Sequence, residues 1–385
     1  MSNLLIIGVF MGKCRFCGLE SITVSNRISA CVNCIRENKD ALIEVKNIHS
    51  DIRFKLGLTP ETPIGGSVKC SVCGRGCVLS SDQRGYCSIR VYRDGRLATI
   101  TGDERIAIGL YYYDPHPTNC VAFPVCPAIT GRGYPKYALE RYGEHGYYNI
   151  AVFMGGCNLD CLYCQNWEYR SMSIKGKPTI SIDDLVKAVN EKTTCVCFFG
   201  GDPGPWSTFV LQATHKMVKR AEELGLRVFR VCWETNGLWN PILFKKAVKY
   251  SIETGGIVKI DFKAWSPEVY YALTGAEPKH VGLIKKNIEY VASLFNIRKD
   301  PPLLVISTLL VPGYIDEYEI DHMTKYIADL NPEIPYVFLA FHPDYELIDL
   351  PRTSHRHMER AIEIARRNGL KNVYMGNAWL LGYDY

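Results

Sequence analysis

From about residue 148 to its end, the chain alternates short apolar runs with longer amphipathic runs. The apolar runs have the length of strands and lie at 148–154, 195–199, 227–233, 257–262, 303–310 and 336–341, with a seventh at 372–375. Helix signals fall between them, such as the cap formed by Ser181 and Asp184 and the stop at Gly225. Repeated βα units of this length predict a parallel sheet with helices outside it. The expected fold class is therefore α/β, with six units forming a partial (β/α)6 barrel.

The chain contains 16 cysteines in 385 residues, and most of them are clustered. The apolar start Leu4–Phe10 is too short to span a membrane and lacks the basic residues of a secretory signal, so the expected localisation is cytoplasmic. In a reducing compartment, clustered cysteines indicate metal sites rather than disulfides. Because oxygen attacks exposed iron–sulfur centres, we also expect an anaerobic setting.

Three cysteines with the spacing CxxxCxxC follow the first predicted strand of the barrel. They are Cys157, Cys161 and Cys164, preceded by two glycines. A [4Fe–4S] cube normally takes four thiolates, so three leave one iron open to a substrate or cofactor. The alternative is a zinc knuckle with a fourth ligand from elsewhere. The next cysteine, Cys195, lies on a predicted strand and is a poor candidate for that ligand.

Two further cysteine groups precede the barrel and define two more domains, at 1–60 and 67–147, before the barrel domain at 148–385. The first is a zinc-ribbon or rubredoxin-like pair of CxxC knuckles, expected to hold Zn or a mononuclear Fe as a structural staple: Cys14, Cys17, Cys31 and Cys34. The second has a compact CxxCxxxC pattern that suits an auxiliary iron–sulfur cluster: Cys70, Cys73, Cys77 and Cys87.

The loop after the second group leaves alternatives open. Cys120 and Cys126 are either ligands of a second auxiliary centre or buried thiols. The aromatic segment 111–117 is expected to pack against the barrel, with His116 in a structural role. Cys195, Cys197 and Cys232 on the predicted strands are expected to be buried thiols, and donation or acceptance of a hydrogen atom is the lesser alternative.

Polar residues of chemical interest stand at the ends of the predicted strands, where barrels collect their active-site groups. The segments are Gly200-Gly201-Asp202-Pro203, Glu234-Thr-Asn236-Gly, Asp261-Phe-Lys263, Thr308 to Gly313, and Phe341-His342-Pro343. Each segment taken alone has an ordinary structural explanation, such as a turn or a paired buried carboxylate. Five such segments in one order, each at the end of its strand, favour a common site.

The cysteine spacing and these segments resemble the radical S-adenosylmethionine (SAM) superfamily, in the branch of the glycyl-radical-enzyme (pyruvate formate-lyase) activating enzymes, with an extra cysteine-rich N-terminal region. The resemblance covers about 200 residues and implies a TIM-like partial barrel in which the open iron chelates SAM. Gly200, Gly201 and Asp202 resemble the segment that receives the amino group of SAM, although an Asp stands where the family has Glu.

The resemblance also implies roles for the other strand ends. Asp261 and Lys263 would hold the carboxylate and ribose of SAM, with Glu234 and Asn236 beside them. The backbone around Thr308 would read adenine, and His342 would lie near the ribose. Lys263 and His342 are the candidate catalytic residues.

The implied chemistry is the reductive cleavage of SAM to a 5′-deoxyadenosyl radical that takes hydrogen from an unactivated C–H bond. The additional cysteines favour oxidative C–C coupling or C–H functionalisation of a large substrate such as a hydrocarbon lipid, with peripheral membrane contact in that case. The alternatives are a protein-radical activase and, in another class, a multi-cluster electron-transfer protein. The expected electron donor is a ferredoxin or flavodoxin. No nucleic acid is expected, because the net charge of +5 forms no basic block.

Overall fold

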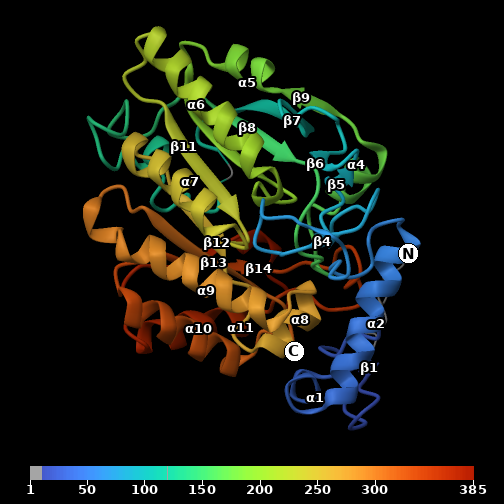
Figure 1. The fold of residues 1–385 in the computed structure, drawn as a ribbon. Helices are drawn as coiled ribbons and strands as arrows, with labels where there is room; N and C mark the ends of the chain where they lie inside the picture. Colours follow the sequence, from blue (N-terminus) through green and yellow to red (C-terminus); the bar gives the residue numbers. More distant parts are fainter. Residues whose placement is uncertain (1–10, 119) are drawn as a thin grey trace, which may run out of the picture.

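The computed structural model describes residues 11–118 and 120–385, and a nine-stranded sheet forms its centre (Figure 1). The strand order is β15-β14-β13-β12-β11-β10-β8-β7-β9. The parallel strands are β8 (Tyr148–Met154), β10 (Thr193–Gly200), β11 (Arg230–Thr235), β12 (Val258–Asp261), β13 (Leu304–Leu310), β14 (Tyr336–Ala340) and β15 (Val373–Gly376). The α/β class with a parallel barrel-like sheet is confirmed, and the run at 372–375 is its seventh parallel strand.

Helices follow the strands and cover the outside of the sheet (Figure 1). They are α4 (Tyr169–Lys175), α5 (Ile182–Ala188), α6 (Ser207–Glu223), α7 (Pro241–Thr254), α8 (Pro267–Thr274), α9 (Pro278–Ser293), α10 (Glu317–Leu330) and α11 (His355–Arg367). Their starts obey local rules: Ser181 and Asp184 form the predicted capping box, and the Asn240 side chain caps α7 directly before Pro241. No helix within the described ranges is both long and apolar enough to cross a bilayer.

The aromatic segment before the barrel is a strand of the central sheet. Strand β7 (Ile106–Pro115) pairs antiparallel with β8 and, on its other side, with β9 (Thr179–Ser181). Tyrosine-rich runs suit strands because their rings pack well on a pleated surface. The expectation that 111–117 packs against the barrel is met by backbone pairing, and the buried His116 ring contacts the hydroxyl of Thr194 at 2.9 Å.

Shorter elements carry the cysteine groups before the barrel. They are the strand pairs β1 (Gly12–Lys13) with β2 (Glu20–Ser21), β3 (Val68–Lys69) with β4 (Val78–Leu79), and β5 (Arg90–Arg93) with β6 (Arg96–Thr99), and the helices α1 (Val32–Glu37), α2 (Lys39–Lys55) and α3 (Pro127–Thr130). The first segment docks on the barrel, since Arg36 of α1 pairs with Asp316 at 2.6 Å and with the buried Glu319 at 3.1 Å.

Candidate cluster and cofactor site

A cavity of about 640 Å³ lies at the carboxyl ends of the parallel strands. Its wall combines the loop after β8, the ends of β10 to β15, and the loop between β7 and α3. Ten of the twelve residues predicted to hold the CxxxCxxC cluster and SAM line it: Cys157, Cys161, Cys164, Gly200, Gly201, Asp202, Glu234, Asn236, Asp261 and Lys263. Tertiary structure thus gathers segments that are more than 100 residues apart in sequence around one space.

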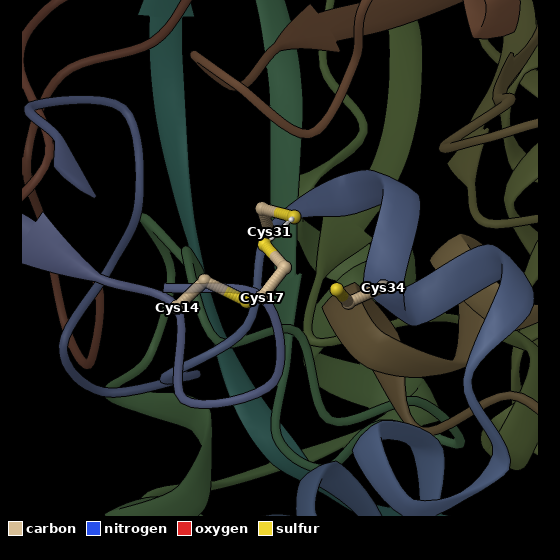
Figure 2. A group of neighbouring side chains, drawn as sticks. All are labelled: Cys14, Cys17, Cys31 and Cys34. Carbon is tan, nitrogen blue, oxygen red and sulfur yellow. Dashed lines mark hydrogen bonds between the residues drawn. The ribbon is translucent and has the colours of Figure 1, made fainter. Parts of the chain in front are cut away.

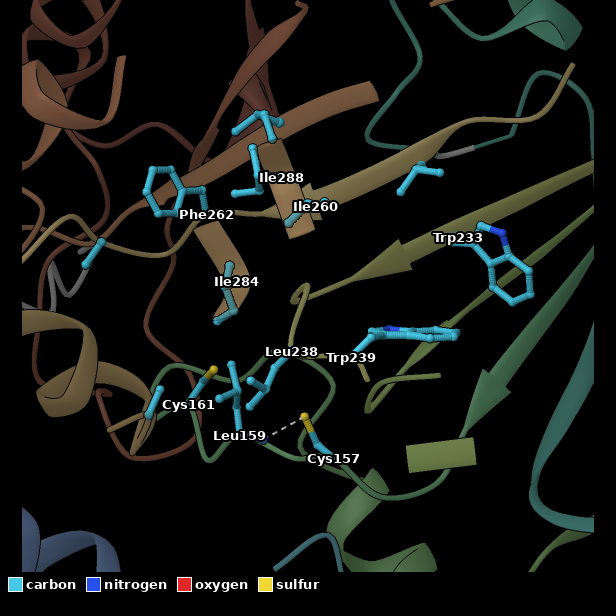
Figure 3. Close-up of a cluster of buried hydrophobic side chains, with 14 of the residues drawn as sticks. Cys157, Leu159, Cys161, Trp233, Leu238, Trp239, Ile260, Phe262, Ile284 and Ile288 are labelled. Atoms are coloured by element: carbon cyan, nitrogen blue, oxygen red, sulfur yellow. Dashed lines mark hydrogen bonds between the residues drawn. The ribbon is translucent and has the colours of Figure 1, made fainter. Parts of the chain in front are cut away.

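The three cysteines of the CxxxCxxC run enter this cavity from the loop after β8. Cys157 and Cys161 are buried and Cys164 is half-buried. Figure 3 shows Leu159 between Cys157 and Cys161, and the backbone N–H of Leu159 donates to Cys157 Sγ at 3.4 Å. Within the described ranges, these sulfurs do not converge within 4.8 Å of one another as single-ion ligands would. A wider set of three thiols in one cavity fits three corners of a [4Fe–4S] cube.

Two glycine pairs allow the loops of the site to approach each other. A Cβ on Gly201 would lie 2.1 Å from the carbonyl oxygen of Gly156, so no side chain fits there. Gly156 itself has φ +85°, a left-handed conformation that favours glycine, and its Cβ would lie 3.0 Å from the carbonyl oxygen of Cys87. These contacts bring the cluster loop, the Gly200–Asp202 segment and the auxiliary cysteine region together.

Asp202 connects two of the strand ends. Its buried carboxylate accepts hydrogen bonds from the N–H of Gly204 at 2.7 Å, from the hydroxyl of Thr235 at 2.8 Å and from the N–H of Asn236 at 2.8 Å. Burial raises the pKa of Asp202 to about 6, although these donors lower it in part. Asp202 thereby positions the backbone of Asn236, whose amide contacts Cys157 Sγ at 3.7 Å. The role of Asp202 toward the amino group of SAM stays a prediction.

A row of alternating charges crosses the cavity wall. Lys259 Nζ lies 3.4 Å from Glu234 and 2.8 Å from Asp261, and Lys263 Nζ lies 3.2 Å from Asp261. Burial alone raises the pKa of Asp261, but the two lysines reverse this and hold it below its usual range. Lys259 is absent from the predicted site. Its position two residues before Asp261 on the same strand was the available signal, because alternate residues share a face.

Thr308 and His342 are not among the described residues that line the cavity. The Thr308 hydroxyl donates to the carbonyl of Phe262 at 2.7 Å, whereas the neighbouring Ser307 donates to Asp261 at 2.6 Å and lines the cavity. His342 Nδ1 contacts the carbonyl of Pro343 at 3.2 Å. The roles of the Thr308 backbone and of His342 toward SAM stay predictions.

The first cysteine group forms a compact quartet (Figure 2). The sulfur atoms of Cys14, Cys17, Cys31 and Cys34 all lie within 4.8 Å of one another. Cys17 Sγ and Cys31 Sγ are 3.7 Å apart, which matches the edge of about 3.8 Å in a tetrahedron of 2.3 Å zinc–sulfur bonds. Burial raises the pKa of Cys14, but backbone N–H groups outweigh it and lower the value to about 6. The predicted single-ion site is therefore geometrically formed.

The second group lies directly behind the cavity. Cys70, Cys73, Cys77 and Cys87 are buried, and the charges of neighbouring thiols add to burial in raising the pKa of Cys73. Hydrogen bonds connect this group to the cavity, since the N–H of Gly74 donates to the carbonyl of Leu238 at 3.0 Å and the N–H of Leu238 donates to the side chain of Asn236 at 2.9 Å. Four buried thiols without single-ion convergence suit the predicted auxiliary cluster, whose occupancy stays a prediction.

The remaining cysteines lie inside the barrel. Cys120, on the loop between β7 and α3, lines the cavity and donates to Glu234 Oε1 at 3.5 Å. Cys126 is buried at the start of α3, and Cys195 and Cys197 are buried on β10, with Cys197 opposite Cys232 of β11. Among the described residues, none of these five belongs to a group of three or more side chains close enough together to hold one metal ion.

A buried ion cluster supports the cysteine loop from behind. Asp160, between Cys157 and Cys161, is fully buried and lies 3.0 Å from Arg170 of α4, 3.3 Å from Arg53 and 3.1 Å from His49, both of α2. Burial raises the pKa of Asp160, but Arg53 and Arg170 outweigh it and hold the value far below its usual range. These contacts hold the cysteine loop to α2, which precedes it in the sequence, and to α4, which follows it.

Comparison with known proteins agrees with this geometry. Residues 151–326 match the Radical SAM superfamily. The chain is 24% identical over 319 residues to an uncharacterised protein of Methanocaldococcus jannaschii, covering 80% of this chain and 81% of that one. It is 24% identical over 241 residues to a putative glycyl-radical enzyme activating enzyme of the same organism, covering 61% and 87%.

A crystal structure of a domain of pyruvate-formate lyase-activating enzyme from Bacteroides vulgatus is also similar, with 20% identity, a TM-score of 0.35, and coverage of 47% of this chain and 98% of that one. The resemblance that the cysteine spacing predicted is thus confirmed over residues 151–326. A match to that superfamily implies an enzyme that uses a [4Fe–4S] cluster and SAM.

Proposed function

We propose that this protein is a radical SAM enzyme that cleaves SAM reductively and directs the resulting radical at an unactivated C–H bond of a large substrate. The observation that carries the proposal is the single cavity shared by Cys157, Cys161, Cys164 and the strand-end residues. When bound there, a [4Fe–4S] cluster and SAM supply a one-electron cleavage to methionine and a 5′-deoxyadenosyl radical.

Several side chains of the cavity would bind different parts of SAM. The three thiols leave one iron corner without a protein ligand, which is where the amino and carboxylate groups of SAM would bind. Lys263 offers a cation near Cys161. Burial raises the pKa of the Cys161 thiol to about 12, although the Lys263 charge opposes this rise in part. Glu234 and Asp261 offer carboxylates that share the Lys259 cation, and the Ser307 hydroxyl donates to Asp261.

The far wall of the cavity supports a substrate with an apolar part. It is built from hydrophobic side chains of the loop after β7, of α3, of the last three strands and of the turn after β15: Val121, Phe123, Ile129, Leu309, Leu339, Met375 and Trp379. Apolar lining with few polar groups is typical of pockets that bury organic ligands. C–H functionalisation or C–C coupling of a large substrate, a hydrocarbon lipid included, remains our leading reaction type.

Protein-radical activation is the second candidate. It is favoured by the similarity to a relative described as a putative glycyl-radical enzyme activating enzyme. In that case the substrate is a backbone glycine of another protein, and the reaction leaves a stable radical on that protein which electron paramagnetic resonance detects.

The test is to purify the protein without oxygen, reconstitute it with iron and sulfide, add SAM and dithionite, and measure 5′-deoxyadenosine. We expect cleavage by the wild type and none by the Cys157→Ala/Cys161→Ala/Cys164→Ala variant. Cys195→Ala serves as the matched control, because Cys195 is buried on β10 away from the cavity. Absence of cleavage by a fully reconstituted wild type would support a multi-cluster electron-transfer protein instead.

A further inference from the structure

One thiol outside the three cysteine groups reaches the proposed reaction cavity. Five cysteines remain when the groups are set aside, and the four named Cys126, Cys195, Cys197 and Cys232 are not among the described residues that line the cavity. Cys120 lines it together with the cluster cysteines and is half-buried. Its loop supplies other parts of the same wall, including Val121 and Phe123.

Contacts within the barrel orient the Cys120 thiol. Its S–H donates to Glu234 Oε1 at 3.5 Å, while Glu234 Oε2 lies 3.4 Å from Lys259 Nζ. The carboxylate is thereby held between an ammonium group and a thiol. A second thiol, Cys197 of β10, lies 4.0 Å from the same Oε1. A carboxylate only accepts hydrogen bonds, so Cys120 meets it in the protonated form that has a hydrogen to give.

We infer that Cys120 is a hydrogen-atom donor that quenches carbon-centred radicals formed in this cavity. The inference deepens the proposed function and rests on it. The S–H bond is weaker than an aliphatic C–H bond, so transfer from sulfur to a carbon radical is downhill. In that step the S–H bond breaks homolytically, a C–H bond forms, and the unpaired electron stays on Cys120 Sγ. One electron from the one-electron reductant that the SAM cleavage already requires, and one proton from water, restore the thiol.

Hydrogen donation by Cys120 limits the kinds of reaction that the substrate radical can complete in this cavity. A substrate radical that regains hydrogen from Cys120 has not lost a second electron, so its product arises by rearrangement, bond cleavage or addition to an unsaturated partner. Within C–H functionalisation and C–C coupling, the structure therefore assigns the outcome to reactions that end with hydrogen return rather than to net oxidation.

The test uses the 5′-deoxyadenosyl radical itself as the carbon radical, so no substrate is needed. Reconstituted protein is exchanged into D2O buffer without added thiols, given SAM and dithionite, and the 5′-deoxyadenosine is analysed by mass spectrometry. Since thiol hydrogens exchange with solvent and C–H hydrogens do not, we expect one deuterium in the product of the wild type. In Cys120→Ser, which keeps the size and the hydrogen bond to Glu234, the label should fall to the natural-abundance level. Cys232→Ala, which changes a buried thiol outside the cavity, should keep the label.

A second measurement needs no turnover. In the reconstituted protein without reductant, iodoacetamide should alkylate Cys120 faster than Cys126, as seen by peptide mapping, and SAM should slow the modification of Cys120. Equal deuterium content in the 5′-deoxyadenosine from the wild type and from Cys120→Ser would overturn the inference. So would alkylation of Cys120 that SAM does not slow. Both outcomes leave SAM cleavage itself standing. Failure to form any 5′-deoxyadenosine would instead overturn the proposed function, and the donor role with it.

Discussion

Replacement of Asp160 by Asn tests how the cysteine loop is held. Asp160 is fully buried, and the arginines that it neutralises, Arg53 and Arg170, are 1% and 2% exposed. The amide has the same shape, and its Nδ2 can donate to His49 Nδ1 while His49 Nε2 still contacts the carbonyl of Ala272. The hydrogen bonds are thus largely kept, and the change removes the negative charge from between two buried cations.

The expected loss follows from that charge. Removing one partner of a buried ion pair costs about 3 to 5 kcal/mol, since the remaining charge is left uncompensated. We therefore expect the free energy of unfolding at pH 7 to fall by about 4 kcal/mol in Asp160→Asn. Exposed ion pairs contribute about 0 to 1 kcal/mol. Asp329→Asn is therefore a matched control, because Asp329 pairs with Lys325 at 3.1 Å on the surface of α10.

The assay is urea unfolding of the anaerobically reconstituted protein, followed by tryptophan fluorescence. Arg170→Met and the double variant complete a cycle, in which the double variant should lose less than the sum of the two single losses. The pKa of Asp160 is lowered in the folded state, so its contribution is complete above the unfolded pKa of about 3.9 and is lost only as the pH falls below that value. A loss at pH 7 no larger than that of Asp329→Asn, or additive losses in the cycle, would refute the reasoning.

Three further predictions concern the metal quartet, a titrating carboxyl and the charge row. Cys14→Ser should lose one metal ion per chain by elemental analysis while SAM cleavage persists, because the quartet lies outside the cavity; loss of SAM cleavage would contradict a structural role. The pKa of Asp202 is raised to about 6, so the folded state binds the extra proton and its stability contribution falls as the pH rises from about 4 to about 6. Infrared difference spectra between pH 5 and pH 7 should show a protonated carboxyl that is missing in Asp202→Asn. Lys259→Met leaves two neighbouring carboxylates without their shared cation and should weaken SAM binding by about tenfold, which is roughly 1.4 kcal/mol. Equilibrium dialysis would check this against the exposed control Lys249→Met, and unchanged affinity would exclude the charge row from SAM binding.

The sequence by itself determined the features that depend on near neighbours. Alternating apolar and amphipathic runs predicted the seven parallel strands, and caps such as Ser181 and Asn240 predicted where helices begin. The CxxxCxxC and CxxC spacings predicted the cysteine groups. These features are local because a turn, a cap or a chelating loop is closed by residues a few positions apart.

Tertiary structure decided which side chains meet. The register of β13 directs Ser307 rather than Thr308 into the cavity, since adjacent strand residues face opposite ways. Lys259 acquired its place between Glu234 and Asp261 only when β11 and β12 paired. Cys120 reached Glu234, 114 residues away in sequence, because β7 joined the sheet and its loop turned into the barrel. Such contacts depend on the packing of whole elements, whereas local spacing indicates only which residues of one strand share a face.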